Sequence, residues 1–147
     1  MINHIWSVLC RESIIDIDSN TISLINVVEE LIVDLKPDVK LPMGEKLNIN
    51  VNYEVVSMWS RDSFDDRAIG LKIELINPDK SVVNEFTHKA VFPEKTIRLR
   101  TRIKVQGLTV TVAGVYYIQV LYRHSDSEKF KTVARLPMQV QINKQIQ

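Results

Sequence analysis

Alternation of apolar and polar side chains is the clearest pattern in the chain, and it is strongest from Leu47 onward. Apolar residues stand at every second position over residues 47–55, with asparagine or glutamate at the positions between them. Because successive side chains of a strand point to opposite faces, this period predicts a half-buried β-strand. Its polar face turns apolar at Val56 and Met58, so we expect another element to cover that end.

The same period predicts strands through the rest of the chain. Residues 71–75 alternate, and the following Asn-Pro-Asp-Lys has proline where a type I turn prefers it, so we expect a hairpin that returns through residues 82–92. Alternation resumes over residues 97–105, 108–112, 116–122 and 136–142, and the polar run at 124–129 suits a hairpin tip. Strands separated by turns roughly every ten residues favour a sandwich or barrel over β–α–β units.

The first third of the chain supports two interpretations. Residues 2–9 and 14–17 have strand character and are closed by Asp18, Ser19 and Asn20, which predicts an N-terminal β-hairpin region. Over residues 22–35 the apolar spacing also fits a helix capped by Ser23, but the many valine and isoleucine residues favour a strand. One short helix therefore stays open as an alternative, and residues 36–44 are expected to be a connector.

Together these patterns predict an all-β fold, an antiparallel two-sheet sandwich formed as one domain over residues 1–147. The length is that of a single domain, and the proportions of 45% hydrophobic and 25% charged residues are those of an ordinary folded protein.

Charge and cysteine content narrow the classes of function. The 19 lysine and arginine residues face 18 acidic residues, so no overall positive charge draws the chain to nucleic acid or anionic lipid. Cys10 is the single cysteine, which excludes an internal disulfide and favours a reducing compartment. The start lacks the features of a signal peptide, and no apolar run approaches the ~20 residues of a membrane span. We therefore expect a cytoplasmic protein without membrane contact.

The stretch 112–118, Val-Ala-Gly-Val-Tyr-Tyr-Ile, resembles the beginning of strand F in immunoglobulin-like sandwiches, where glycine or alanine stands two residues before a tyrosine that locks the corner. In this resemblance Ile118 takes the place of the strand F cysteine, and Trp59 resembles the core tryptophan of strand C. It implies a disulfide-free immunoglobulin-like fold and no particular activity.

Residues 9–11 and 21–30 are similar to the N-terminus of small bacterial proteins of unknown function, which also implies no activity.

A row of cations is the strongest local candidate for binding. Arg98, Arg100, Arg102 and Lys104 share one parity, so alternation places them on one sheet face about 6.6 Å apart. Such a row could follow a polyanion, for example a single-stranded nucleic acid. The row also fits a solvated sheet face or a charged edge strand. We prefer this interpretation, because no aromatic residue for base stacking lies between the cations.

Apolar side chains at outward positions are candidates for a protein interface. Strand parity turns Val56, Met58 and Leu121 outward, and exposed apolar patches often mark contacts such as those of a homo-oligomer. Phe64 lies in a polar loop and is a candidate anchor for a partner, because aromatic side chains often dominate interface energies. Alternatively, it folds back over the core.

Residues for catalysis or metal binding do not gather in the sequence. His4, His88 and His124 fall in three different predicted elements, and four scattered glycines form no nucleotide-binding motif. We therefore predict neither a metal nor another cofactor. The preferred hypothesis is a non-catalytic module that contacts another protein or a copy of itself, and a polyanion binder and an enzyme of unassigned class stay open as alternatives.

Overall fold

The computed structural model describes residues 1–35 and 46–144, and the regular structure within them consists of β-strands. The all-β prediction is confirmed. The strands are β1 (Ile2–Asp16), β2 (Thr21–Val27), β3 (Glu30–Leu35), β4 (Leu47–Arg61), β5 (Ala68–Ile76), β6 (Val82–Val91), β7 (Arg98–Val110), β8 (Gly114–Arg123) and β9 (Lys131–Lys144). The helix left open for residues 22–35 is wrong, because β2 and β3 occupy this stretch and its branched side chains favour extended backbone. The connector expected at residues 36–44 lies outside the described residues.

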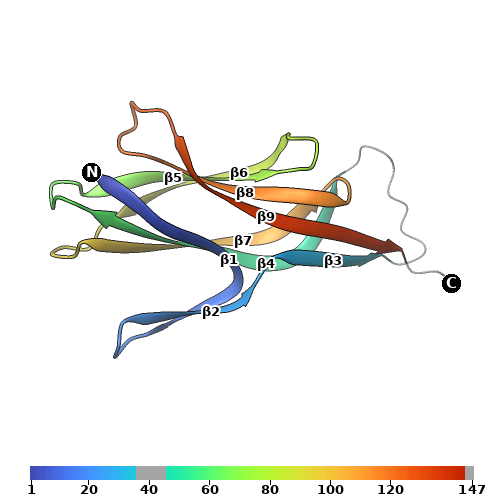
Figure 1. The fold of residues 1–147 in the computed structure, drawn as a ribbon, viewed down its shortest axis with the longest axis horizontal. Coiled ribbons are helices and arrows are strands. Elements are labelled where there is room, and N and C mark those ends of the chain that lie inside the picture. Colours follow the sequence, from blue (N-terminus) through green and yellow to red (C-terminus); the bar gives the residue numbers. More distant parts are fainter. Residues whose placement is uncertain (36–45, 145–147) are drawn as a thin grey trace.

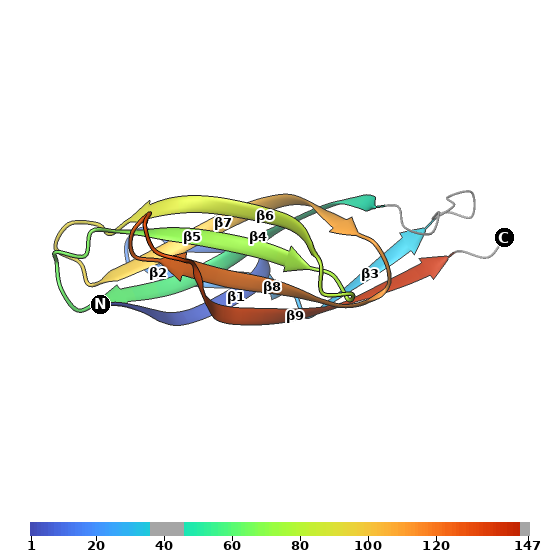
Figure 2. The ribbon, with the colours of Figure 1, turned by 90° about the horizontal axis from the view of Figure 1, so that it is seen from above.

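The strands form two sheets that pack face to face (Figures 1 and 2). One sheet has the order β2-β1-β4-β7 and the other has the order β3-β9-β8-β5-β6. Neighbouring strands are antiparallel in each described pair except β3 and β9, which run parallel. The two-sheet prediction is confirmed, and the purely antiparallel pairing is wrong at this one place. Alternation reports which side chains face inward and carries no information about the direction of a neighbouring strand.

The hydrophobic core lies between the two sheets and is filled by the inward-facing residues of each alternating pattern. Trp59 on β4 and Tyr116 on β8 are fully buried there. The Trp59 indole N–H donates to Thr101 Oγ1 at 3.0 Å, and its ring lies 5.6 Å from that of Tyr122 on the facing sheet. Full burial of a large apolar side chain stabilises a fold by roughly 1.5–3 kcal/mol, so this layer holds the sandwich together.

Tyr116 also fixes the connection between β7 and β8. Its hydroxyl donates to the carbonyl oxygen of Val112 at 2.7 Å and accepts from the backbone N–H groups of Thr111 at 2.9 Å and Val112 at 3.1 Å. Gly114 precedes it with a φ of +145°, and a Cβ there would come within 2.8 Å of Pro78 Cγ. This turn therefore requires glycine, and the buried tyrosine hydroxyl holds the turn through three hydrogen bonds to its backbone.

Trp59 is a core residue of the four-stranded sheet. Trp59 lies on β4, in the sheet that faces the one containing Tyr116. Its burial follows from the strand parity that it shares with the buried Val55.

Strand β1 takes part in two pairings and bends between them. Its first half pairs with β4 as far as Cys10, and its second half pairs with β2 from Cys10 to Asp16. Figure 1 shows this second half and β2 turning back along the outer face of the four-stranded sheet, so that the sheet curls. The N-terminal β-hairpin is thus confirmed. It supplies the cover that was expected over Val56 and Met58.

Candidate interaction surface

Three connections gather at one end of the molecule, called the loop end below (Figures 1 and 2). They are the β4–β5 loop (residues 62–67), the β6–β7 connection (92–97) and the β8–β9 loop (124–130), and the tip of the β1–β2 hairpin lies toward the same end. The Arg61 backbone N–H donates to the carbonyl of Ile97 at 2.9 Å, and that of Phe92 donates to the carbonyl of Arg67 at 2.9 Å. The first two connections are therefore tied to each other by backbone hydrogen bonds.

Arg61, the last residue of β4, is buried beneath these connections with 6% of its surface exposed. Its guanidinium donates to four backbone carbonyls, those of Thr96 at 2.8 Å, Asp66 at 3.0 Å, Pro93 at 3.1 Å and Phe64 at 3.3 Å. It also stacks between two aromatic rings, with its central carbon 4.9 Å from the centroids of both Phe64 and Phe92. A buried charge is costly unless its donors are satisfied, and here the backbone of two loops satisfies them. Arg61 thus holds the β4–β5 loop and the β6–β7 connection in one arrangement.

A groove of about 420 Å³ opens beside Arg61 between these two segments and is called the aromatic groove below. Phe64 and Val91 line it, and 58% and 63% of their surfaces are exposed. The charged side chains of Arg67, Lys95 and Glu94 also line the groove. Exposed apolar side chains beside charged side chains on a fixed backbone form a surface suited to a protein contact.

A second groove, of about 650 Å³, lies between the β1–β2 hairpin and the start of β7 and is called the hairpin groove below. Ile15 and Asn20 contribute to it from the hairpin, and Met58 and Leu99 add apolar lining from the sheet. Its charged lining consists of Lys95, Arg98 and Arg100. Because Lys95 lines both grooves, they flank the two sides of the β6–β7 connection.

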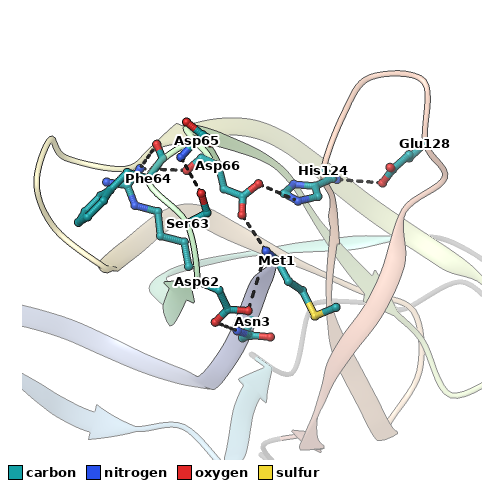
Figure 3. A network of polar contacts seen from close by, with 10 residues as sticks. Met1, Asn3, Asp62, Ser63, Phe64, Asp65, Asp66, His124 and Glu128 are labelled. Atoms are coloured by element: carbon teal, nitrogen blue, oxygen red, sulfur yellow. Dashed lines mark hydrogen bonds and ion pairs between the residues drawn. The ribbon is translucent and has the colours of Figure 1, made fainter.

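Polar contacts link the first residues of the chain to two loops at the same end (Figure 3). The amino group of Met1 donates to Asp66 at 2.8 Å, and Asp66 also lies 3.3 Å from Nε2 of His124. Asn3 donates to Asp62 at 3.1 Å. The hydrogen bond from the amino group is the main cause that holds the pKa of Asp66 below its ordinary value. These two loop carboxylates therefore connect segments of the loop end.

The predicted row of cations lies on β7, at the end of the strand order of its sheet. Three of its four side chains form polar contacts with other residues of the same chain. Arg100 donates to the backbone carbonyl of Asn20, Arg102 donates to Ser13 Oγ at 3.4 Å, and Lys104 lies 4.0 Å from the buried carboxylate of Glu54. Asn20 and Ser13 belong to the hairpin, so the hairpin folds over the middle of the row. These contacts favour the interpretation of the row as a charged edge strand with internal partners.

Two of the predicted interface residues are buried and do not form an exposed patch. Val56 has 0% of its surface exposed because the bent β1 and the hairpin cover that face of β4. Leu121 has 8% exposed; it lies opposite Lys72 in the register, and the Phe130 ring lies 5.6 Å from Lys72 Nζ. Outward parity in a strand therefore did not mean exposure at these positions.

The other two predicted interface residues lie at the loop end. Met58 is half-buried and lines the hairpin groove, and Phe64 is exposed and lines the aromatic groove. The structure thus brings Phe64, Met58, Arg98 and Arg100 together around one connection, although the sequence assigned them to separate hypotheses.

A histidine and two hydroxyl groups form a short chain on the inner side of β1 and β4. His4 Nε2 lies 2.7 Å from Ser7 Oγ, which lies 2.7 Å from Ser57 Oγ. Burial lowers the pKa of His4, and its ring packs edge-on against Trp59 at 5.1 Å. A histidine beside a serine can activate a nucleophile, but none of these three residues lines the grooves described above. The contacts satisfy polar groups in a half-buried position.

Metal ligands do not converge in the part of the chain that the structure describes, since no three His, Cys, Asp or Glu side chains there are placed to hold an ion. The same residues, 1–35 and 46–144, contain no helix long and apolar enough to cross a membrane.

Sequence reasoning missed Arg61, Lys95, Val91 and Ile97 at the loop end. One signal could have found Arg61, because it shares the inward parity of Trp59 and Val55, and a charged residue at a core position needs partners. Lys95 has a positive φ of 61°, and nothing in the local sequence predicts this backbone conformation. Val91 and Ile97 are 63% and 56% exposed and flank the connection that the sequence treated only as a break between strands.

Comparison with known proteins adds no family to this description. No protein-family model matches the chain, and no curated protein matches it.

Proposed function

We propose that this chain is a non-catalytic protein-interaction module with an immunoglobulin-like architecture, and that the loop end is its binding surface. The observation that carries the proposal is the pairing of exposed apolar side chains, Phe64 and Val91, with loops held by the buried Arg61. A surface that is fixed before binding loses little conformational entropy on binding, which favours recognition.

The strand order supports the architectural part of the proposal. β4 pairs with β7, while β5 lies between β6 and β8, and β9 follows β8. In an immunoglobulin-like sandwich, strand B pairs with strand E, and strands C, F and G share the other sheet. Under this correspondence the β4–β5 and β8–β9 loops take the place of the B–C and F–G loops, which form the recognition end of variable domains.

Selection of peptides from a random displayed library against the full-length chain tests the proposal. We expect the selected peptides to lose at least about tenfold in affinity for a Phe64→Ala, Val91→Ala double variant, because aromatic and apolar anchors carry most interface energy. The matched control is Val112→Ala with Val115→Ala, which also removes two exposed apolar side chains (51% and 41%) but near the opposite end. Failure to select any peptide, or equal loss with the control, would refute the proposal.

Binding of a polyanion through the cation row is the competing proposal. It predicts salt-dependent binding of a labelled oligonucleotide that Arg100→Glu weakens. Because Arg100 and Arg102 already donate to the hairpin, our proposal predicts no binding that depends on Arg100.

A further inference from the structure

We propose that the partner of the loop end is an acidic peptide segment, which places carboxylates beside Lys95 and Arg98 and one apolar side chain in the hairpin groove. This inference rests on the proposed function and adds the chemistry of the partner. It is carried by charge complementarity and by the shape of the hairpin groove.

Charge is distributed unevenly around this groove, although the whole chain is nearly neutral at 19 cations and 18 anions. The lining holds Lys95, Arg98 and Arg100 and contains no carboxylate among the described residues. Arg100 is engaged by Asn20, whereas Lys95 and Arg98 have no carboxylate within 4.0 Å in residues 1–35 and 46–144. Two exposed cations are thus available to a ligand that brings its own negative charge.

The rest of the groove is suited to an apolar side chain. Ile15, Met58, Ile97 and Leu99 line it, and its volume of about 650 Å³ falls within the roughly 300–1,000 Å³ of typical ligand sites. The lining contains no aromatic ring on which a base could stack, which favours a peptide over a single-stranded nucleic acid.

Both walls of the groove are fixed by contacts within the chain. On one side Arg61 holds the β6–β7 connection through the carbonyls of Pro93 and Thr96. On the other side Arg100 donates to Asn20 at the tip of the hairpin. Lys95 adopts a backbone conformation with a φ of 61°, which side-chain-bearing residues rarely adopt and which the surrounding contacts must support.

Fluorescence anisotropy with three labelled peptides tests the chemistry. The first carries a leucine flanked by glutamates, the second replaces the glutamates by glutamine, and the third replaces the leucine by serine. We expect the first peptide to bind at least about tenfold more tightly than either of the others, with an affinity that falls as salt is added. Equal binding of the glutamine peptide would overturn the inference.

A pair of matched variants locates the binding. Lys95→Asn with Arg98→Gln removes both free cations, and asparagine tolerates the positive φ at residue 95. The control, Lys80→Asn with Arg135→Gln, also removes two cations and includes a lysine with a positive φ, 72°, in the β5–β6 turn away from the loop end. We expect at least about a tenfold loss in the first variant and less than about twofold in the control.

The outcomes separate this inference from the proposed function. If the acidic peptide fails to bind while library-selected peptides still depend on Phe64 and Val91, the partner chemistry is wrong and the interaction module stands. If neither class of peptide binds, both fall. Binding of an oligothymidylate that is as tight as that of the acidic peptide would also overturn the inference, because it would show a general polyanion site.

Discussion

Tyr53 lies in the core, where burial raises the pKa of its hydroxyl to about 12. The unfolded chain ionises this group near pH 10, so the neutral form is favoured by the fold. Because the folded pKa is the higher one, this contribution to stability is complete below pH 10 and is lost as the pH rises toward 12.

The expected size of the effect at Tyr53 is a fall of about 2 kcal/mol in the free energy of unfolding between pH 10 and pH 12. Urea unfolding at a series of pH values measures it. A Tyr53→Phe variant supplies the reference, since the other tyrosines and lysines titrate in both proteins. Between pH 10 and pH 12 the free energy of unfolding should fall by about 2 kcal/mol less in the variant than in the parent. An equal fall in both proteins would contradict the prediction.

Cys10 is a second residue whose chemistry burial controls. It has no exposed surface, and burial together with the nearby charge of Glu54 raises the pKa of its thiol. Since the thiolate is the reactive form, we expect alkylation by iodoacetamide at pH 8 to be at least about tenfold slower in the folded protein than in denaturant. Mass spectrometry over time measures the two rates, and equal rates would show that β1 opens freely at this position.

At the scale of elements, Arg61 joins two loops and its removal should loosen both. Arg61→Met keeps most of the apolar stem but leaves four backbone carbonyls without their donor. We expect the free energy of unfolding to fall by roughly 2–4 kcal/mol, measured by urea denaturation. Arg61→Lys retains the charge with fewer donors and should lose less. A variant as stable as the parent would show that the loops hold themselves in place.

The strands were predictable from sequence to the extent that they follow a period of two. The pattern from Leu47 to Trp59 predicted β4, and the proline turn at residues 77–80 predicted the β5–β6 hairpin, because each pattern directly reflects which face is buried. The bend of β1 at Cys10 and the parallel pairing of β3 with β9 were not predictable in this way. Both depend on contacts between segments that are distant in sequence. Local periodicity carries no information about such contacts.

At the scale of the whole molecule, the candidate site was predictable only in parts. Phe64 was identified because aromatic side chains in loops often dominate interface energies, and Arg98 and Arg100 were identified because their spacing placed them on one face. Their gathering around the β6–β7 connection depends on the hairpin folding back over the sheet and on Arg61 beneath the loops. Neither follows from the order of residues within a strand.

The folded-back hairpin also changes what a substitution at Val56 should do. Were this face an interface between copies of the chain, Val56→Asp would convert an oligomer into a stable monomer. Because Val56 is fully buried within one chain, the carboxylate would instead lose its contact with water, and we expect the free energy of unfolding to fall by more than about 3 kcal/mol. Phe64→Asp, at an exposed position, should change it by less than about 1 kcal/mol. Urea denaturation combined with mass measurement at several protein concentrations distinguishes the two cases. A stable monomeric Val56→Asp variant derived from an oligomeric parent would show that the hairpin does not cover this face in solution.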